Sequence, residues 1–108
     1  MRDYSIYLDQ ILDMMKKLKS SNLDNLETDD DLFDATIMRL QVIGESASKI
    51  PKEIRKKHSF IPWEMLIKTR DFVSHHYEKI DVNIMKILIT EKLIPIEKDL
   101  IKLSEVDL

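Results

Sequence analysis

Side chains that can transfer protons and bind anions are concentrated in one stretch of the sequence, RDFVSHHY at residues 70–77. An unperturbed imidazole titrates at about pH 6.5, so His75 could accept or donate a proton near neutral pH. The guanidinium of Arg70 stays charged and can donate two parallel hydrogen bonds to phosphate oxygens. Asp71 could orient either group, and Tyr77 could hydrogen-bond a phosphate or help to position His75. These residue types indicate acid–base chemistry at a phosphate group.

The spacing of these residues restricts how they can meet. On an ideal helix Tyr77 falls within roughly 20° of Arg70, whereas His75 lies about 140° from Arg70. The three side chains therefore cannot share one helical face. Convergence requires either a break of the helix after about Ser74 or a second subunit that brings its own copy across a two-fold axis.

A metal site is the rival chemistry, because His58, His75 and His76 together offer three imidazoles. Adjacent histidines on a helix point about 100° apart. The sequence has no cysteine, and it lacks the H-E-x-x-H spacing with which one helix binds zinc. We therefore predict no metal site. Two structural interpretations stay open: Arg70 as a surface arginine paired with a carboxylate, and His75 as a hydrogen-bonded core histidine.

Length and composition predict a single all-α domain over residues 1–108. Hydrophobic residues make up 44% and charged residues 34% of the chain, with one glycine and three prolines, whereas sheets and loops use these two residue types more often. A chain of this size can bury one hydrophobic core. Because there is no cysteine and no apolar run of roughly 20 residues, we expect a cytoplasmic protein that does not enter the membrane.

Apolar residues recur at helical spacing in successive segments. Tyr4, Leu8 and Ile11 begin a broad apolar face in the first of them. In the second, the small residues Gly44 and Ala47 would let another helix come close. The pattern predicts helices from Tyr4 to about Leu18, from a capping box at Thr28 and Asp31 to the residue before Pro51, from Pro51 to Lys57, from Pro62 into residues 70–77, and from the N-cap Asp81 past a kink at Pro95 to Leu100.

Charge is distributed unevenly along the chain. The net charge is −3, which argues against a protein that coats nucleic acid through a strong basic field. Between Lys49 and Arg70, however, seven basic residues face only two acidic ones. The basic run from Lys49 to Lys57 could follow an RNA backbone or could simply be a solvated face. The residue pattern leaves both interpretations open.

The spacing Arg70-x4-His75-x-Tyr77 resembles the signature of the HepT-like branch of the HEPN superfamily, whose members show Asn or Asp where Asp71 stands. The likeness extends beyond this motif. The blocks MRDYSIYLDQIL, LQVIGESASKIPKEI and IPWEMLIKTRDFVSHHYEKID resemble the blocks of that family in the same order. An arginine and a histidine at this spacing would often occur by chance, but the ensemble covers nearly the whole chain.

The resemblance implies an antiparallel bundle of four to five helices that dimerises with both motifs facing one cleft. It also implies the toxin of a type II toxin-antitoxin pair, acting as a metal-independent endoribonuclease without a cofactor. The partner implied is an MntA-type nucleotidyltransferase antitoxin, which would attach AMP to Tyr77. A larger assembly with the antitoxin is possible. The alternative is a noncatalytic HEPN module that binds a nucleotide or docks a nucleotidyltransferase.

The resemblance assigns catalysis to Arg70 and His75, with Asp71 and Tyr77 in support. RNA would be cut by attack of the 2′-hydroxyl, with His75 moving the proton and Arg70 stabilising the charge that develops on the phosphate. Glu45, within the IGES block, could support this site or cap a neighbouring group. Further candidate RNA contacts are Lys68, His76 and Lys79.

Overall fold

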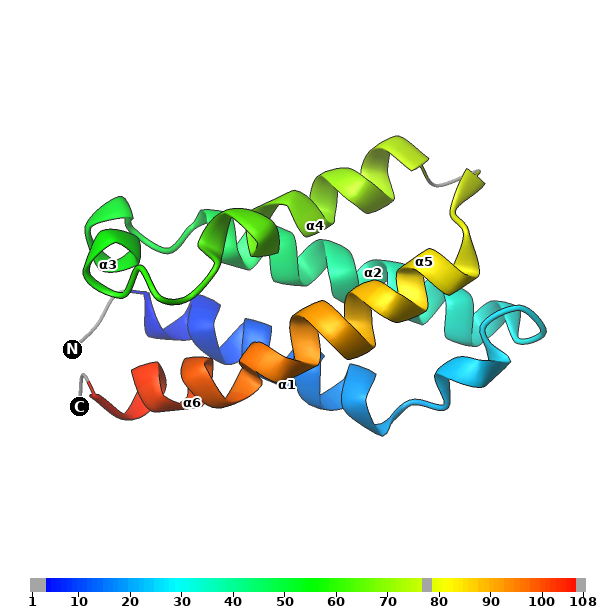
Figure 1. The fold of residues 1–108 in the computed structure, drawn as a ribbon, viewed down its shortest axis with the longest axis horizontal. Helices are drawn as coiled ribbons and strands as arrows, with labels where there is room; N and C mark the ends of the chain where they lie inside the picture. Colours follow the sequence, from blue (N-terminus) through cyan, green and yellow to red (C-terminus); the bar gives the residue numbers. More distant parts are fainter. Residues whose placement is uncertain (1–3, 77–78, 107–108) are drawn as a thin grey trace.

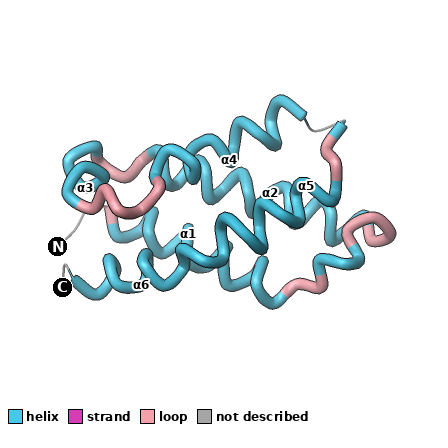
Figure 2. Tube along the Cα trace, viewed as in Figure 1, coloured by secondary structure: helices cyan, strands magenta, loops and turns pink. Residues whose placement is uncertain are grey.

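The computed structural model describes residues 4–76 and 79–106, without the side chains of His75 and His76. Across these ranges the chain is all-α and contains no strand (Figure 2), which confirms the predicted fold class. No helix within them is both long enough and apolar enough to cross a bilayer. The elements are α1 (Ser5–Ser20), η1 (Leu23–Asn25), α2 (Asp30–Ser48), α3 (Lys52–Lys57), α4 (Trp63–His76), α5 (Val82–Ile87), η3 (Leu88–Leu93), η4 (Ile94–Ile96) and α6 (Glu97–Val106).

The long helices run alternately in opposite directions along the bundle. α1 and α4 run one way, whereas α2 and the continuous run from α5 to α6 return the other way, so the start of α1 and the end of α6 lie at the same end (Figure 1). α2 packs against α1 on one side and against α4 on the other. The short helix α3 lies at the end of the bundle where α2 finishes and α4 begins. α2 is therefore the helix against which α4 packs.

Helix starts follow local capping chemistry, with one correction to the sequence prediction. The N-cap of α2 is Asp29, whose carboxylate accepts a hydrogen bond from the backbone N–H of Leu32 at 3.0 Å. The predicted capping box at Thr28 is therefore wrong by one residue, because the Thr28 hydroxyl donates to the carbonyl of Asn25 at 3.4 Å instead. Asp81 caps α5 as predicted, accepting from the N–H of Asn83 at 2.8 Å.

The predicted disturbance at Pro95 appears as a change of helix type. The chain stays helical through this region, but α5 passes into the π-helical segment η3 and then into the 3₁₀ turn η4, which contains Pro95. Proline has no backbone N–H, and its ring collides with the carbonyl four residues earlier, so a regular α-helix cannot pass through it. Through these irregular turns the helical chain continues into α6.

Trp63 anchors the start of α4. Its side chain is buried, and its indole Nε1 donates a hydrogen bond to the carbonyl of His58 at 3.0 Å. Because this bond ties the loop after α3 to the first turn of α4, it fixes where α4 starts.

The closest approach between α2 and α4 lies at Gly44. A Cβ atom at this position would come within 2.5 Å of both the Cβ and the backbone N of Arg70. No real Cβ tolerates that distance, so only glycine allows α4 to lie this close. The prediction that the small residues of this segment admit another helix is confirmed at Gly44, and the helix admitted is the one that carries Arg70.

We predict that Gly44→Ala destabilises the protein. The added methyl group meets backbone atoms that cannot swing aside, and such overpacking costs about 1–3 kcal/mol, of which the better helix propensity of alanine returns about 1 kcal/mol. Because the clash involves backbone, we place the cost in the upper part of this range, and urea unfolding should show a net loss of about 1–2 kcal/mol in the free energy of unfolding. Gln41→Ala, at an exposed position of the same helix, should stay within about 0.5 kcal/mol of the wild type. A Gly44→Ala protein as stable as the wild type would contradict the close contact.

Candidate functional site

The guanidinium of Arg70 is held by side chains from two helices. Its Nη1 lies 3.0 Å from Oε2 of Glu45 and 3.0 Å from Oγ of Ser48, both on α2. Its Nε lies 3.6 Å from Oδ1 of Asp71, the next residue of α4. The Ser48 hydroxyl donates to the carbonyl of Glu45 at 2.6 Å, so its oxygen is oriented to accept from Arg70. These contacts fix the planar group in one orientation.

One edge of the Arg70 guanidinium remains available. Both hydrogens of Nη1 are used by Glu45 and Ser48, whereas Nη2 forms no hydrogen bond or ion pair with any side chain that the structure describes. The side chain is 33% exposed, so water or an anion can reach it. Nη2 therefore offers two N–H donors to an incoming oxygen.

The two carboxylates around Arg70 have a second effect. Glu45 and Asp71 orient the guanidinium, but their negative charge also repels an approaching phosphate. Both side chains are about half exposed, at 53% and 52%, so water screens this repulsion. The two carboxylates therefore orient the guanidinium precisely but lower the positive potential around it.

The helix that carries Arg70 continues through position 75. α4 extends unbroken from Trp63 to His76, so a break after about Ser74, one of the two ways in which the motif residues could converge, does not occur there. On a regular helix position 75 lies about 140° round the axis from position 70. The backbone of one chain therefore directs the two motif positions to different sides of α4.

The remaining predicted residues lie on or just beyond the same helix. Lys68 is exposed on α4, with Nζ 3.9 Å from a carboxylate oxygen of Glu64, and Lys79 is exposed beyond the helix end. His76 belongs to the last turn of α4, but its side chain, like that of His75, lies outside the described atoms. Tyr77 lies outside the described residues.

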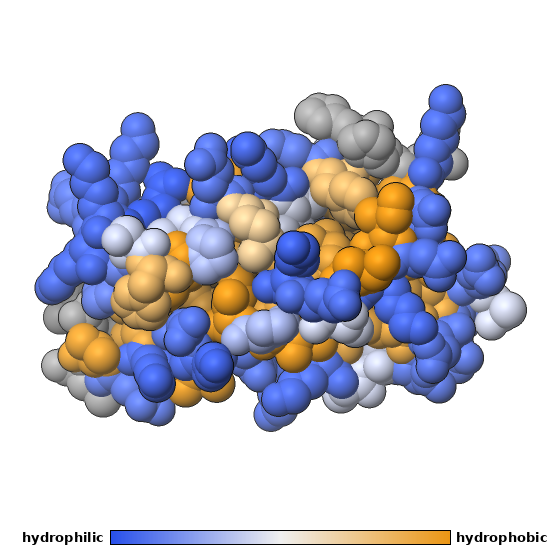
Figure 3. Space-filling view, in the orientation of Figure 1, coloured by the Kyte–Doolittle hydropathy of each residue, from blue (hydrophilic) through white to orange (hydrophobic). Residues whose placement is uncertain are grey.

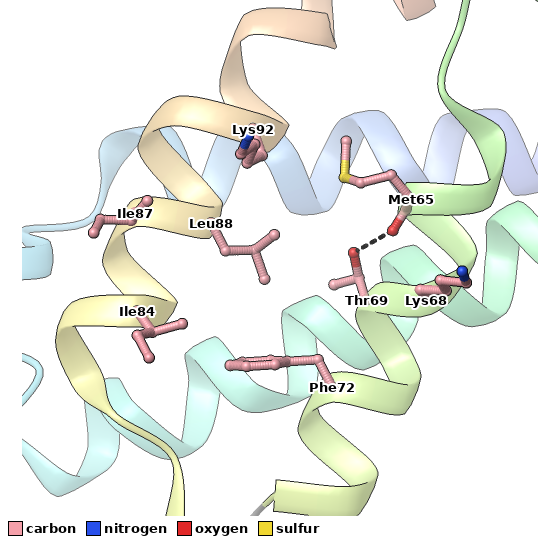
Figure 4. Close-up of a pocket in the computed structure, with 8 residues that line it drawn as sticks. All are labelled: Met65, Lys68, Thr69, Phe72, Ile84, Ile87, Leu88 and Lys92. Carbon is pink, nitrogen blue, oxygen red and sulfur yellow. Dashed lines mark hydrogen bonds between the residues drawn. The ribbon is translucent and has the colours of Figure 1, made fainter.

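An apolar groove runs between α4 and the α5–η3 segment. It has a volume of about 320 Å³. Phe72 projects from α4 towards Ile84 and Leu88, and Lys68 and Lys92 are the charged residues among those that line it (Figure 4). Hydrophobic side chains are exposed over the same part of the surface (Figure 3). A groove of this composition does not suit a phosphate backbone, so we do not assign RNA to it.

No group of three His, Asp, Glu or Cys side chains arranged to hold a metal ion occurs within the described part of the chain. The described part includes the side chain of His58 but not those of His75 and His76. The His58 ring instead packs edge-on against Phe60, with 6.1 Å between the ring centroids.

Ser48 is the member of the site that the sequence analysis missed. Glu45 was recognised through the IGES block, and the structure places it against Arg70. Ser48 follows Glu45 by three residues and Gly44 by four, so all three lie on one side of α2. That spacing could have identified it once Gly44 was taken as the crossing point of two helices.

Comparison with known proteins identifies the family. The family model described as Ribonuclease HepT-like matches residues 7–103. A Caldanaerobacter subterraneus protein named "Putative RNase TTE0752" is 30% identical over 96 residues, which are 85% of this chain and 86% of that protein. A Thermococcus cleftensis protein named "Probable ribonuclease HepT" is 35% identical over 51 residues, covering 47% of this chain and 46% of the relative.

A longer relative extends the match along almost the whole chain. The Methanocaldococcus jannaschii protein named "Gamma-glutamylcyclotransferase and putative RNase MJ0434" is 28% identical over 110 residues, covering 96% of this chain. The chain spans about half of that relative, at 49% of its length. No solved structure matches the chain.

The matched range includes α2, α4 and every described contact of Arg70. The all-helical bundle is the fold that the sequence resemblance implied. The chain belongs to the HepT-like ribonuclease family.

Proposed function

We propose that the protein is a metal-independent endoribonuclease and the toxin of a type II toxin-antitoxin pair. The observation that carries this proposal is the state of Arg70, whose guanidinium is held by Glu45 and Ser48 while Nη2 has no partner among the side chains that the structure describes. Membership of the HepT-like ribonuclease family supports RNA as the substrate. The compartment proposed is the cytoplasm, where the RNA targets of such a toxin are found.

The proposed reaction uses the ribose 2′-hydroxyl as the nucleophile. His75 takes the proton from that hydroxyl, the 2′-oxygen bonds to phosphorus, and the bond from phosphorus to the 5′-oxygen breaks. The protonated imidazole then gives a proton to the leaving 5′-oxygen, and the products are a 2′,3′-cyclic phosphate and a 5′-hydroxyl end. Arg70 stabilises the negative charge that builds on the nonbridging oxygens through Nη2. Glu45, Ser48 and Asp71 act as positioning residues, because they orient Arg70.

We further propose that two chains build the active site. Positions 70 and 75 occupy one unbroken helix and lie about 140° apart around it. A two-fold axis can bring Arg70 of one chain opposite His75 of its partner, which a single straight helix cannot do. This geometry supports a homodimer as the form that carries out the proposed chemistry.

Regulation by an MntA-type nucleotidyltransferase antitoxin completes the proposal. AMP attached to Tyr77 would place bulk and negative charge two residues beyond His75. Both would oppose the RNA phosphate through occlusion and like-charge repulsion.

We predict that the purified protein cuts single-stranded RNA in excess EDTA. His75→Ala should slow cleavage by about 10²–10⁴-fold, the usual contribution of a general acid or base. Arg70→Lys should slow it by about 10²–10³-fold, because lysine keeps the charge but loses the planar donors held by Glu45 and Ser48. End-labelled RNA resolved on a gel measures both rates and identifies the cyclic phosphate.

Arg39→Lys is the matched control for this experiment. Arg39 lies on α2 and donates to Oγ of Ser21 at 3.0 Å, away from the contacts of Arg70, so the same replacement there should leave the rate within about twofold of the wild type. Circular dichroism confirms that each variant is folded. Absence of cutting by a folded wild type would overturn the nuclease proposal and favour the noncatalytic module, and cutting that EDTA abolishes would overturn its metal independence.

We predict that two inactive chains complement each other. In a mixed dimer of Arg70→Ala and His75→Ala chains, one of the two composite sites holds an intact Arg70 and an intact His75. Random mixing makes about half of the dimers mixed, so about one quarter of wild-type activity should return. Native mass spectrometry verifies the exchange of subunits. Exchange without any return of activity would show that Arg70 and His75 do not act across the dimer.

We predict that co-production with a nucleotidyltransferase of the MntA type adds AMP to the wild type but not to Tyr77→Phe. Intact-mass spectrometry detects the modification, and the modified wild type should no longer cut RNA. The unmodified Tyr77→Phe protein should still cut RNA. A folded Tyr77→Phe protein that is inactive without modification would instead give Tyr77 a direct catalytic role.

A further inference from the structure

A second groove lies on the other side of α4 from the apolar one. It is an open depression of about 710 Å³ between α3 and the first half of α4. Its lining comes from α3 (Lys52, Arg55, Lys56), from the loop that follows (Ser59, Ile61, Pro62) and from one side of α4 (Trp63, Glu64, Ile67, Lys68, Asp71).

Positive charge predominates in this groove. Four of its lining residues are basic and two are acidic. Both acids already face a cation, since Glu64 lies 3.9 Å from Lys68 and Asp71 lies 3.6 Å from Nε of Arg70. The three cations that α3 contributes to the groove have no ion pair with any described residue. In a chain of net charge −3, this is a local site for anions.

Arg55 carries the clearest sign of a missing partner. Its Nε is buried and makes no hydrogen bond within the described part of the chain. A buried donor without an acceptor costs free energy, and a charged donor costs more than a neutral one. Because Nε itself is buried, a phosphate in the groove would have to bind the outer nitrogens of the same guanidinium.

The α4 side of the groove leads towards the proposed active site. Glu64, Lys68 and Asp71 lie at positions i, i+4 and i+7 of the helix, and position 75 continues the series at i+11. Asp71 also touches Arg70. From residue 64 to residue 71 the helix rises about 10 Å, the length of about three stacked nucleotides along one strand.

We propose that this groove binds the backbone phosphates of the single-stranded RNA on one side of the bond that is cut. Lys52, Arg55 and Lys56 contact the phosphates, and the strand then follows α4 towards position 75, where the proposed dimer brings His75 of one chain opposite Arg70 of its partner. This inference rests on the proposed ribonuclease function and adds the path by which the substrate reaches the site.

The groove selects for backbone rather than for base identity. Its charged groups suit phosphate oxygens, and its one aromatic side chain, Trp63, is 6% exposed and has its indole N–H bonded to the carbonyl of His58. Trp63 therefore offers no platform on which a base could stack. Hydrophilic side chains cover this end of the molecule around α3 (Figure 3). Binding here should be strong at low salt and tolerant of sequence.

The test measures binding of a labelled single-stranded RNA to the His75→Ala protein, which holds the RNA uncut, over a series of salt concentrations. Lys52→Gln, Arg55→Gln and Lys56→Gln are combined in this background. Loss of three phosphate contacts should flatten the slope of log affinity against log salt by about 2 units. Between 50 and 200 mM salt, the advantage of the parent over the triple variant should fall by roughly 15-fold.

The matched control removes the same number of charges elsewhere. Lys16, Lys98 and Lys102 are exposed on α1 and α6, outside the groove, and form no ion pair with described residues. Their combined change to Gln should leave the slope close to that of the parent. Equal effects of the two triple variants, or no RNA binding by the parent at 50 mM salt, would overturn the groove assignment.

The same experiment separates this inference from the function on which it rests. If the protein with His75 intact cuts RNA but the groove variant binds as tightly as the parent, the nuclease stands and the groove assignment falls. If the protein never cuts RNA but the groove variant loses the salt-dependent binding, the groove stands as an RNA site and the nuclease falls.

Discussion

The contact between Gly44 of α2 and Arg70 of α4 determines the arrangement of the site. A Cβ at position 44 would lie 2.5 Å from the backbone of Arg70, so the absence of one side chain lets the two helices meet. That close approach puts Glu45 and Ser48 within 3.0 Å of the guanidinium. Orientation of the charged group is thus a product of helix packing, and a change in the packing would alter the site without touching a catalytic atom.

The charge around Arg70 differs from the charge around α3, and the net charge of the chain does not show this difference. Arg70 is surrounded by two carboxylates, which orient it but weaken its attraction for phosphate. The cations that α3 contributes to the groove form no ion pair with any described residue. In the proposed mechanism, the α3 groove would supply sequence-independent attraction and Arg70 would stabilise the reacting phosphate. This explains how a chain with a net charge of −3 could act on a polyanion.

The continuity of α4 bears on how many chains the proposed active site needs. A regular helix through His76 separates positions 70 and 75 by about 140°. In the proposed mechanism, which needs both groups at one phosphate, a second chain would supply one of them. The exposed isoleucines of α5 are a separate surface feature, and nothing in the structure shows what covers them.

The sequence by itself determined the helical class, the number and approximate extent of the long helices, the caps at Asp81 and near Asp29, and the family signature. Hydrophobic periodicity and capping are local properties of the chain, so they can be read from neighbouring residues. Only the tertiary structure decided that Gly44 faces Arg70, that Ser48 holds Nη1, that α4 continues past Ser74, and that the basic run of α3 borders the helix of the motif. These relations join residues up to 26 positions apart, and long-range packing rather than local pattern sets them.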